Sequence, residues 1–217
     1  MELSVMVGAL LEGLGLSAGM FVVTLVGSLP LGIVVALARM SKFRLLSLVA
    51  QFYISILRGT PLMLQLMAFM FAPYYLFGIS MDTDWKYGAC AVGFILNYSA
   101  YFAEIYRSGL QSIPKGQYEA ALVLGYSRSQ TFFKIVLPQV IKRIMPAMGN
   151  EIITLVKDTS LAFVLGIAEM FSVAKAISAS EVSMVPYALA ALIYWVFCLL
   201  IEFIIGRAEK KMAYYHD

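Results

Sequence analysis

Long uncharged runs dominate the pattern of hydrophobic and polar positions along this chain. Gly13 to Ala38, Gly59 to Met81 and Val182 to Ile201 contain no charged residue, and Tyr87 to Ala103 is a slightly shorter run of the same kind. A helix rises about 1.5 Å per residue, so roughly 20 apolar residues cross the hydrocarbon core of a bilayer. The four runs therefore predict four transmembrane helices.

A fifth hydrophobic stretch, from about Gly149 to Phe171, is interrupted by charged residues. Those inside it or at its edges are Glu151, Lys157, Asp158 and Glu169. We include it as a span, because without it Val182 to Ile201 would enter the membrane from the opposite side and the charge pattern described next would be reversed. The chain is therefore predicted to be an all-α integral membrane protein with five transmembrane helices.

Basic residues gather in three of the segments between and after these spans. Short loops on the cytoplasmic side of a membrane are enriched in Lys and Arg, and this bias sets the orientation of the helices. Twelve of the sixteen basic residues fall in the three segments: Arg39, Lys42, Arg44, Arg107, Lys115, Arg128, Lys134, Lys142, Arg143, Arg207, Lys210 and Lys211. The other connections, Met1 to Glu12, Asp82 to Lys86 and about Lys175 to Glu181, are acidic or balanced. The N-terminus is predicted to lie outside and the C-terminus in the cytoplasm.

Composition agrees with a membrane protein. Hydrophobic residues make up 61% of the 217, charged residues make up 13%, and the mean hydropathy is +0.84. A soluble domain is about half apolar and a quarter charged. No separate globular domain fits beside the spans, so residues 1–217 are predicted to form a single transmembrane domain. Cys90 and Cys198 both lie in apolar stretches, which excludes a disulfide framework.

The apolar segment Leu45 to Leu57 is too short to cross a membrane and precedes Arg58-Gly59-Thr60-Pro61. It is predicted to be an interfacial helix or the first half of a broken second span. In the second case the irregular backbone would line a cavity, because lipid cannot satisfy exposed peptide groups. A simple loop at the cytoplasmic face is an equally good interpretation.

The connection from about residue 107 to 150 is too long for a tight turn and too patterned for disorder. Gln117 to Leu124 is predicted to be a short helix that ends at Gly125, a residue suited to the left-handed conformation after a helix. Ser127 and Gln130 stand three residues apart, as in a capping box, and so predict the start of a second short helix.

This second helix is expected to continue through an apolar stretch to Leu137-Pro138, where the proline should bend or stop it. Two small helices at a fixed angle would form a rigid knob with Glu119 on its surface. The connection is therefore predicted to be a docking site for a cytoplasmic partner.

The same connection resembles a known family. Glu119-Ala120-Ala121, Gly125 and Ile135-x-Leu137-Pro138 resemble, in residue type and spacing, the EAA loop of permease subunits of bacterial ATP-binding-cassette importers. Three further motifs resemble the polar amino acid uptake subfamily: Arg58-Gly59-Thr60-Pro61-Leu62, Ala103-Glu104-Ile105-x-Arg107 and Lys157-Asp158-Thr159-Ser160-Leu161. The resemblance covers about residues 15 to 210.

The resemblance implies a five-span, non-catalytic subunit of the bacterial plasma membrane. It would pair with a second permease copy or a related permease chain, bind two cytoplasmic ATPases and receive substrate from an extracytoplasmic binding protein. The chain has no Gly-x-x-x-x-Gly-Lys-[Ser/Thr] motif to cradle ATP phosphates. We therefore expect it to bind no cofactor itself, with ATP and Mg²⁺ held by the partner ATPase.

Six residues are the candidates for coupling to that ATPase: Glu119, Ala120, Ala121, Gly125, Leu137 and Pro138. Small side chains at 120 and 121 would let the first short helix seat closely in a cleft, Gly125 would permit the turn, and Glu119 would make a charged or capping contact. The alternative is a loop helix that merely caps the bundle.

Charged residues inside a membrane are costly, so they are candidates for the substrate path. Glu151, Thr154 and Asp158 stand at i, i+3 and i+7, which places them on one helical face. Glu151 could pair with the ammonium of an amino acid or with a basic side chain. Lys157 projects about 100° away from Asp158 and would pair with a neighbouring helix or subunit, or reach the interface. A purely structural ion pair among these residues is the alternative.

Three polar residues in other spans are weaker candidates for the path. Gln65 lies in the second span, and Asn97 and Tyr101 share a face of the third at i and i+4. Such residues more often form hydrogen bonds between helices than contacts with a ligand. No constellation of residues in the sequence suggests a metal site or a catalytic nucleophile.

The leading hypothesis is a permease subunit that works by alternating access in an ATP-driven importer of polar amino acids. Two alternatives are a secondary transporter driven by an ion gradient, with Glu151 and Asp158 as ion carriers, and a membrane scaffold that recruits a cytoplasmic protein. Five spans without an evident internal repeat argue against the secondary transporter. Arginine, histidine, glutamine and cystine all fit the sequence as substrates.

Overall fold

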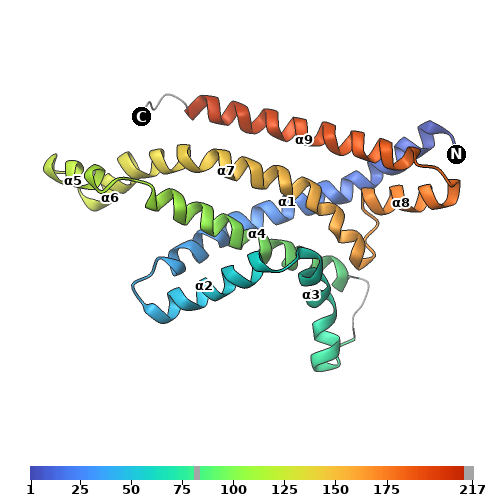
Figure 1. Ribbon diagram of the computed structural model, residues 1–217, viewed down its shortest axis with the longest axis horizontal. Coiled ribbons are helices and arrows are strands. Elements are labelled where there is room, and N and C mark those ends of the chain that lie inside the picture. Colours follow the sequence, from blue (N-terminus) through green and yellow to red (C-terminus); the bar gives the residue numbers. More distant parts are fainter. Residues whose placement is uncertain (81–83, 213–217) are drawn as a thin grey trace.

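The computed structural model describes residues 1–80 and 84–212, and within these residues every regular element is a helix (Figure 1). The α-helices are α1 (Leu3–Arg39), α2 (Arg44–Gly59), α3 (Leu62–Phe77), α4 (Trp85–Gln111), α5 (Lys115–Val123), α6 (Arg128–Thr131), α7 (Leu137–Asp158), α8 (Met170–Glu181) and α9 (Val185–Met212). A π-helical turn, η1 (Phe132–Val136), precedes α7, and a 3-10 helix, η2 (Thr159–Leu165), follows it. Asp82 and Thr83 of the predicted acidic turn lie outside the described residues.

The long helices lie roughly along the long axis of the molecule, with α2 and α3 to one side of α4 (Figure 1). The N-terminus and α8 share one end, where the Met1 ammonium forms an ion pair of 2.8 Å with Glu181. At the opposite end lie α5 and α6, toward which α9 runs back. The segments predicted to face opposite sides of a membrane therefore lie at opposite ends of the bundle.

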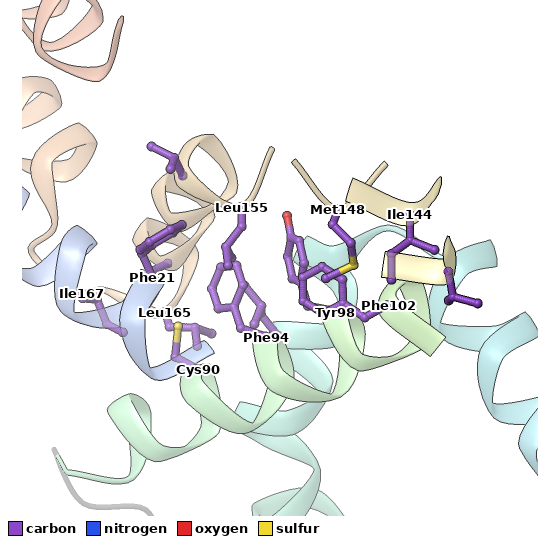
Figure 2. Close-up of a cluster of buried hydrophobic side chains, with 14 of the residues drawn as sticks. Phe21, Cys90, Phe94, Tyr98, Phe102, Ile144, Met148, Leu155, Leu165 and Ile167 are labelled. Atoms are coloured by element: carbon purple, nitrogen blue, oxygen red, sulfur yellow. The ribbon is translucent and has the colours of Figure 1, made fainter. Parts of the chain in front are cut away.

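The core is built on one face of α4. Phe94, Tyr98 and Phe102, spaced by one helical turn, are almost completely buried and point toward α7, where Leu155 is also buried (Figure 2). On the α1 side, a Cβ added to Gly32 would lie only 2.9 Å from the Cβ of Phe102. The absence of a side chain at Gly32 therefore lets α1 and α4 pack closely.

By length and apolar character, two helices among the described residues can cross a membrane: Leu3–Arg39 and Val185–Lys211. Two bent pairs could each supply one more, namely α2 with α3, and Arg128–Leu165 with α8. The helix α4 is absent from this set because it carries polar side chains, including Asn97 and Ser99, that are buried inside the protein. A helix surrounded by other helices does not need a uniformly apolar surface.

The predicted span from about Gly149 to Phe171 is not one continuous helix. The helix α7 ends at Asp158, the 3-10 helix follows, and α8 starts at Met170 with a bend of 59°. Glu169 makes this break possible inside the protein. Its carboxylate is buried and accepts hydrogen bonds of 2.7 Å from the backbone N–H groups of Phe171 and Ser172, which have no partner within the new helix.

The segment predicted as an interfacial helix or half span is helical. It forms α2, and the backbone then turns by 110° at Thr60 and Pro61 before α3 begins. The predicted span from Gly59 to Met81 is thereby shortened to α3, which ends at Phe77 and is followed by Gly78 in the left-handed conformation with φ 66°. Met81 lies outside the described residues.

The connection between α4 and α7 is shorter than predicted, because α4 continues to Gln111 and α7 begins at Leu137. We call residues 112–136 the α4–α7 connection. Of the two predicted outcomes at Pro138, a bend or a stop, the stop does not occur, since η1 leads directly into α7. Proline is tolerated in the first turn of a helix, where its missing N–H is not needed.

Candidate functional site

The α4–α7 connection holds two short helices joined by a tight turn. Gly125 has φ 78°, and the N–H groups of Gly125 and Tyr126 donate to the carbonyls of Leu122 and Ala121 at 3.0 Å each, which is a Schellman motif. The Ser127 hydroxyl accepts from the N–H of Gln130 at 3.2 Å and completes the predicted capping box. Both sequence signals are confirmed, so the angle between α5 and α6 is tightly defined.

The predicted coupling residues do not all face the same way. Glu119 and Ala120 are exposed, but Ala121 is only 1% exposed and packs inside the connection. Leu137 and Pro138 are half-buried at the start of α7, away from the turn. Ala121 and the Leu137-Pro138 pair can therefore shape the connection, and Glu119 and Ala120 are free to touch a partner.

An exposed apolar patch at the end of α5 was missed by the sequence analysis. Leu122, Val123 and Leu124 are 74%, 87% and 73% exposed, and we call these three residues the α5 tip. A groove of about 410 Å³ beside it is lined by Tyr118, Leu122, Tyr126, Arg128, Thr131 and Phe132. Three consecutive apolar residues before a helix-ending glycine are the signal that could have found the patch, because a two-turn helix cannot bury all three.

On α7 the predicted substrate-path residues form a partly open face. The Asp158 carboxylate accepts a hydrogen bond of 2.7 Å from the hydroxyl of Tyr98, which points from α4 toward α7 (Figure 2). The Thr154 hydroxyl donates to the Asn150 carbonyl at 2.9 Å. Glu151 is half-buried and forms no hydrogen bond or ion pair within the described residues. Its charge is thus available to another group.

Lys157 lies apart from this face. Its side chain is exposed and lines a groove of about 610 Å³ between α7 and α9, together with Tyr194 and Cys198. Within the described residues it forms no ion pair with Glu151 or Asp158. The structural ion pair that was the alternative interpretation of these residues is therefore absent from the described part of the chain.

Gln65 and Asn97 hold the break between α2 and α3 against α4. The Gln65 amide donates to the carbonyls of Leu57 and Thr60 at 2.9 and 3.1 Å, and the Asn97 amide donates to Gln65 Oε1 at 2.9 Å and to the Leu57 carbonyl at 3.0 Å. Both side chains are buried. They act as hydrogen-bonding links between helices, which is the alternative that the sequence also favoured.

Tyr101 does not join this network and instead faces Arg58. The Arg58 guanidinium carbon lies 5.1 Å from the centre of the Tyr101 ring, in a cation–π contact. Glu104, one turn further along α4, lies 4.0 Å from Arg58 and accepts two hydrogen bonds from Arg107 at 3.0 and 2.7 Å. Arg58 was present in the sequence only as part of a motif, and no local signal indicated its contact with α4.

The chain resembles a known protein family and individual transport proteins over most of its length. Residues 28–214 match a family described as the inner membrane component of binding-protein-dependent transport systems. The chain is 39% identical over 204 residues to the arginine transport system permease protein ArtQ of Bacillus subtilis, covering 94% of this chain and 92% of that protein. It is also 39% identical to the L-cystine transport system permease protein TcyB of the same organism, over 85% of this chain and 78% of the relative.

Solved structures of ABC transporters also resemble this chain. An amino acid ABC transporter crystallised with histidines has a chain that is 31% identical, with a TM-score of 0.84 and coverage of 94% on both sides. An inward-facing structure of the MetNI methionine ABC transporter is only 19% identical, with a TM-score of 0.75 over 98% of this chain and 99% of its own, and so supports the fold alone.

Proposed function

The chain belongs to the family of inner membrane components of binding-protein-dependent transport systems, and on this basis we propose that it is the permease subunit of an ATP-driven importer of polar amino acids. The observation that carries the proposal is the family match over residues 28–214, together with relatives named for arginine and cystine transport. As a member of this family it is a non-catalytic membrane subunit, and ATP hydrolysis belongs to a separate subunit.

The α4–α7 connection is the proposed contact with the ATPase. Its exposed α5 tip offers apolar surface that no part of the described chain covers, and surfaces of this kind mark sites of protein association. Glu119 and Ala120 stand exposed on the same helix. Under this proposal the partner ATPase binds ATP and Mg²⁺, and this chain binds no cofactor.

The helix α7 is the proposed mechanical link between that contact and the substrate path. It starts at Leu137-Pro138, directly after the connection, and carries Glu151 and Asp158 toward its other end. A 22-residue helix is about 33 Å long, so α7 reaches from the connection to the path residues. Closure of the ATPases would thus shift the path residues directly.

We propose five spans, counting α4 and treating each bent pair as one crossing, with the N-terminus outside and the C-terminus in the cytoplasm. Charged side chains at membrane depth require a protein partner or a water-filled cavity. The face of α7 with Glu151 and Asp158 would meet the same face of a second copy, or of a related permease chain, across such a cavity. Rocking of the two subunits would open this path to alternate sides, receiving substrate from an extracytoplasmic binding protein.

Reconstitution tests the proposal. The permease is placed in liposomes with its ATPase and its binding protein, and uptake of radiolabelled arginine, histidine, glutamine and cystine is measured. We expect uptake of at least one of these only when ATP and both partners are present. Uptake driven by an ion gradient alone would indicate a secondary transporter, and no uptake under any condition would indicate a scaffold.

A further inference from the structure

The Arg58 guanidinium has hydrogen-bonding capacity that the described chain does not use. It lies over the ring of Tyr101, 5.1 Å from its centre, but forms no hydrogen bond within the described residues. Its nearest carboxylate oxygen, on Glu104, is 4.0 Å away, beyond hydrogen-bond distance, and that oxygen already accepts from Arg107 at 2.7 Å. The donors of Arg58 are therefore available to a ligand.

The backbone that carries Arg58 is held firmly. Arg58 is the penultimate residue of α2, directly before the 110° turn. Gln65 and Asn97 both donate to the carbonyl of Leu57, the residue before Arg58, and Gln65 also bonds Thr60. These buried bonds tie the end of α2 to α3 and α4, while Tyr101 orients the side chain. A guanidinium fixed in this way loses little freedom when it binds a partner.

Negative charge lies on α7, beyond two tyrosines of α4. Tyr98 and Tyr101 are neighbours on α4 with ring centres 6.2 Å apart, and Tyr98 binds Asp158 at 2.7 Å while Tyr101 contacts Arg58. Glu151 lies two turns before Asp158 on the same face of α7. The two tyrosines thus lie between the Arg58 guanidinium on α2 and the Asp158 carboxylate on α7.

An amino acid also carries a negative carboxylate and a positive ammonium. We propose that Arg58 binds the α-carboxylate of the transported amino acid, while Glu151 on α7 receives its ammonium. The inference rests on the proposed function and adds to it the group that recognises the carboxylate. The planar guanidinium matches a carboxylate with two parallel hydrogen bonds, which a lysine ammonium cannot reproduce.

This assignment gives Gln65, Asn97 and Tyr101 a common role. They are positioning residues, because they hold Arg58 and do not need to touch the substrate themselves. The α-carboxylate is shared by all amino acids, so Arg58 selects for this class of compound and leaves the choice of side chain to other residues. A merely structural Arg58, stacked on Tyr101 to hold α2 against α4, is the competing explanation.

The test measures binding without the binding protein, whose own selectivity would mask that of the permease. The permease–ATPase complex is purified in lipid nanodiscs, and binding of L-arginine, L-histidine and L-glutamine is compared with binding of their α-carboxamides, which keep the ammonium and side chain. The wild-type complex should bind at least one free acid more tightly than its carboxamide, by about tenfold to a hundredfold for a charged hydrogen-bonded pair.

In Arg58→Gln, affinity for the free acid should fall to that for the carboxamide, and affinity for the carboxamide should stay the same. Arg58→Lys should recover only part of the preference, and Tyr101→Leu should reduce it by less than Arg58→Gln does. The control is Arg44→Gln, the same change at the exposed first residue of α2, which should keep the wild-type preference.

Three results would overturn the inference. They are an unchanged preference for the free acid in Arg58→Gln, an equal loss for acid and carboxamide, and a wild-type complex that binds none of the three amino acids. If Arg58→Gln does not assemble, the ratio of free-acid affinity to carboxamide affinity is measured in Tyr101→Leu and Arg58→Lys instead. Failure of ATP-dependent uptake by the wild-type liposomes would instead overturn the proposed function, so the two outcomes are distinguishable.

Discussion

At the scale of single residues, Glu151 is a carboxylate that the protein leaves without a partner. It is half-buried on α7, and no hydrogen bond or ion pair within the described residues neutralises it. Asp158, on the same helical face, is held by Tyr98. An unpaired carboxylate is costly inside a membrane protein unless a ligand or water meets it. Of these two carboxylates, Glu151 is therefore the more available to bind a cationic group.

Replacing Glu151 by Gln should lower amino acid uptake by about tenfold or more, because a neutral amide loses the charge-assisted hydrogen bond to an ammonium. The measurement is uptake of neutral and cationic amino acids in the reconstituted system. Cationic substrates should lose more if Glu151 also contacts the side chain. Glu202→Gln, at an exposed position of α9, is the matched control. Undiminished uptake of both classes in Glu151→Gln would exclude a substrate role.

Gly125 is a residue whose backbone conformation matters more than its surroundings. A Cβ added there would meet nothing within 4 Å, so crowding does not select glycine. The φ of 78° selects glycine, because the left-handed region is less favourable by about 1 kcal/mol for other residues.

Gly125→Asp should leave the protein inserted and folded but lower coupling between ATP hydrolysis and uptake. The strained turn and the new charge both disturb the surface offered by the α5 tip. The ratio of transported substrate to ATP hydrolysed measures this in liposomes. Gly116→Asp, in the first turn of α5 where φ is ordinary and an acidic side chain is favourable, should keep the wild-type ratio. Equal ratios of transported substrate to hydrolysed ATP in the two variants would exclude a coupling role for Gly125.

At the scale of elements, α5 is a helix whose exposed apolar residues have no role within the chain. It has only nine residues, too few to be stable alone, and Ala121 is its one buried residue. The Schellman turn and the capping box at its end keep it folded. A marginal helix that keeps its apolar residues exposed is most stable when a partner covers them.

Leu122→Ser should therefore weaken association with the ATPase by about tenfold, because burying a leucine side chain contributes about 1.5–3 kcal/mol. Association is measured by equilibrium binding of the purified ATPase to the permease in nanodiscs. The control is Met184→Ser, which is 73% exposed against 74% for Leu122 but lies in the connection between α8 and α9, and α8 is at the end of the molecule away from α5. Equal affinities for the two variants would contradict the docking role.

Breaks in helices position Arg58 and Asp158 as much as the helices do. The turn between α2 and α3 presents Arg58 to Tyr101, and the break between α7 and α8 follows Asp158 directly. In both places buried side chains satisfy the freed backbone groups: Gln65 with Asn97 in the first, and Glu169 in the second. Irregular backbone at membrane depth requires this kind of internal satisfaction.

At the scale of the whole molecule, charge is distributed between two ends. The Met1–Glu181 ion pair lies at one end of the molecule, and the basic α4–α7 connection lies at the other. A membrane protein keeps its excess of Lys and Arg in the cytoplasm. The end with α5 should therefore be cytoplasmic.

Cysteine labelling checks this orientation. With Cys90 and Cys198 replaced by alanine, Ser180→Cys and Ser129→Cys each add a thiol at an exposed position near opposite ends. A membrane-impermeant maleimide applied to intact cells should label Cys at position 180, and should label position 129 only after the membrane is opened. The reverse pattern would invert the proposed topology, and labelling of both in intact cells would exclude it.

The sequence by itself determined the features that depend on near neighbours or on the bilayer. Membrane character follows from the uncharged runs, because lipid tolerates little else. The turn at Gly125 and the capping box at Ser127 depend on contacts within four residues, so they could be located correctly. The motif spacing around Glu119 led to the right family for the same reason, since it needs no knowledge of packing.

Tertiary structure alone decided which side chains meet. Tyr98 and Asp158 are 60 residues apart, and Arg58 reaches Tyr101 only because the chain turns by 110° after α2. Whether a polar residue such as Gln65 binds a ligand or a neighbouring helix depends on what packs against it, and hydropathy holds no information about that. The α7–α8 break was hidden likewise, because the buried carboxylate that makes it possible looks in the sequence like one more charge inside a span.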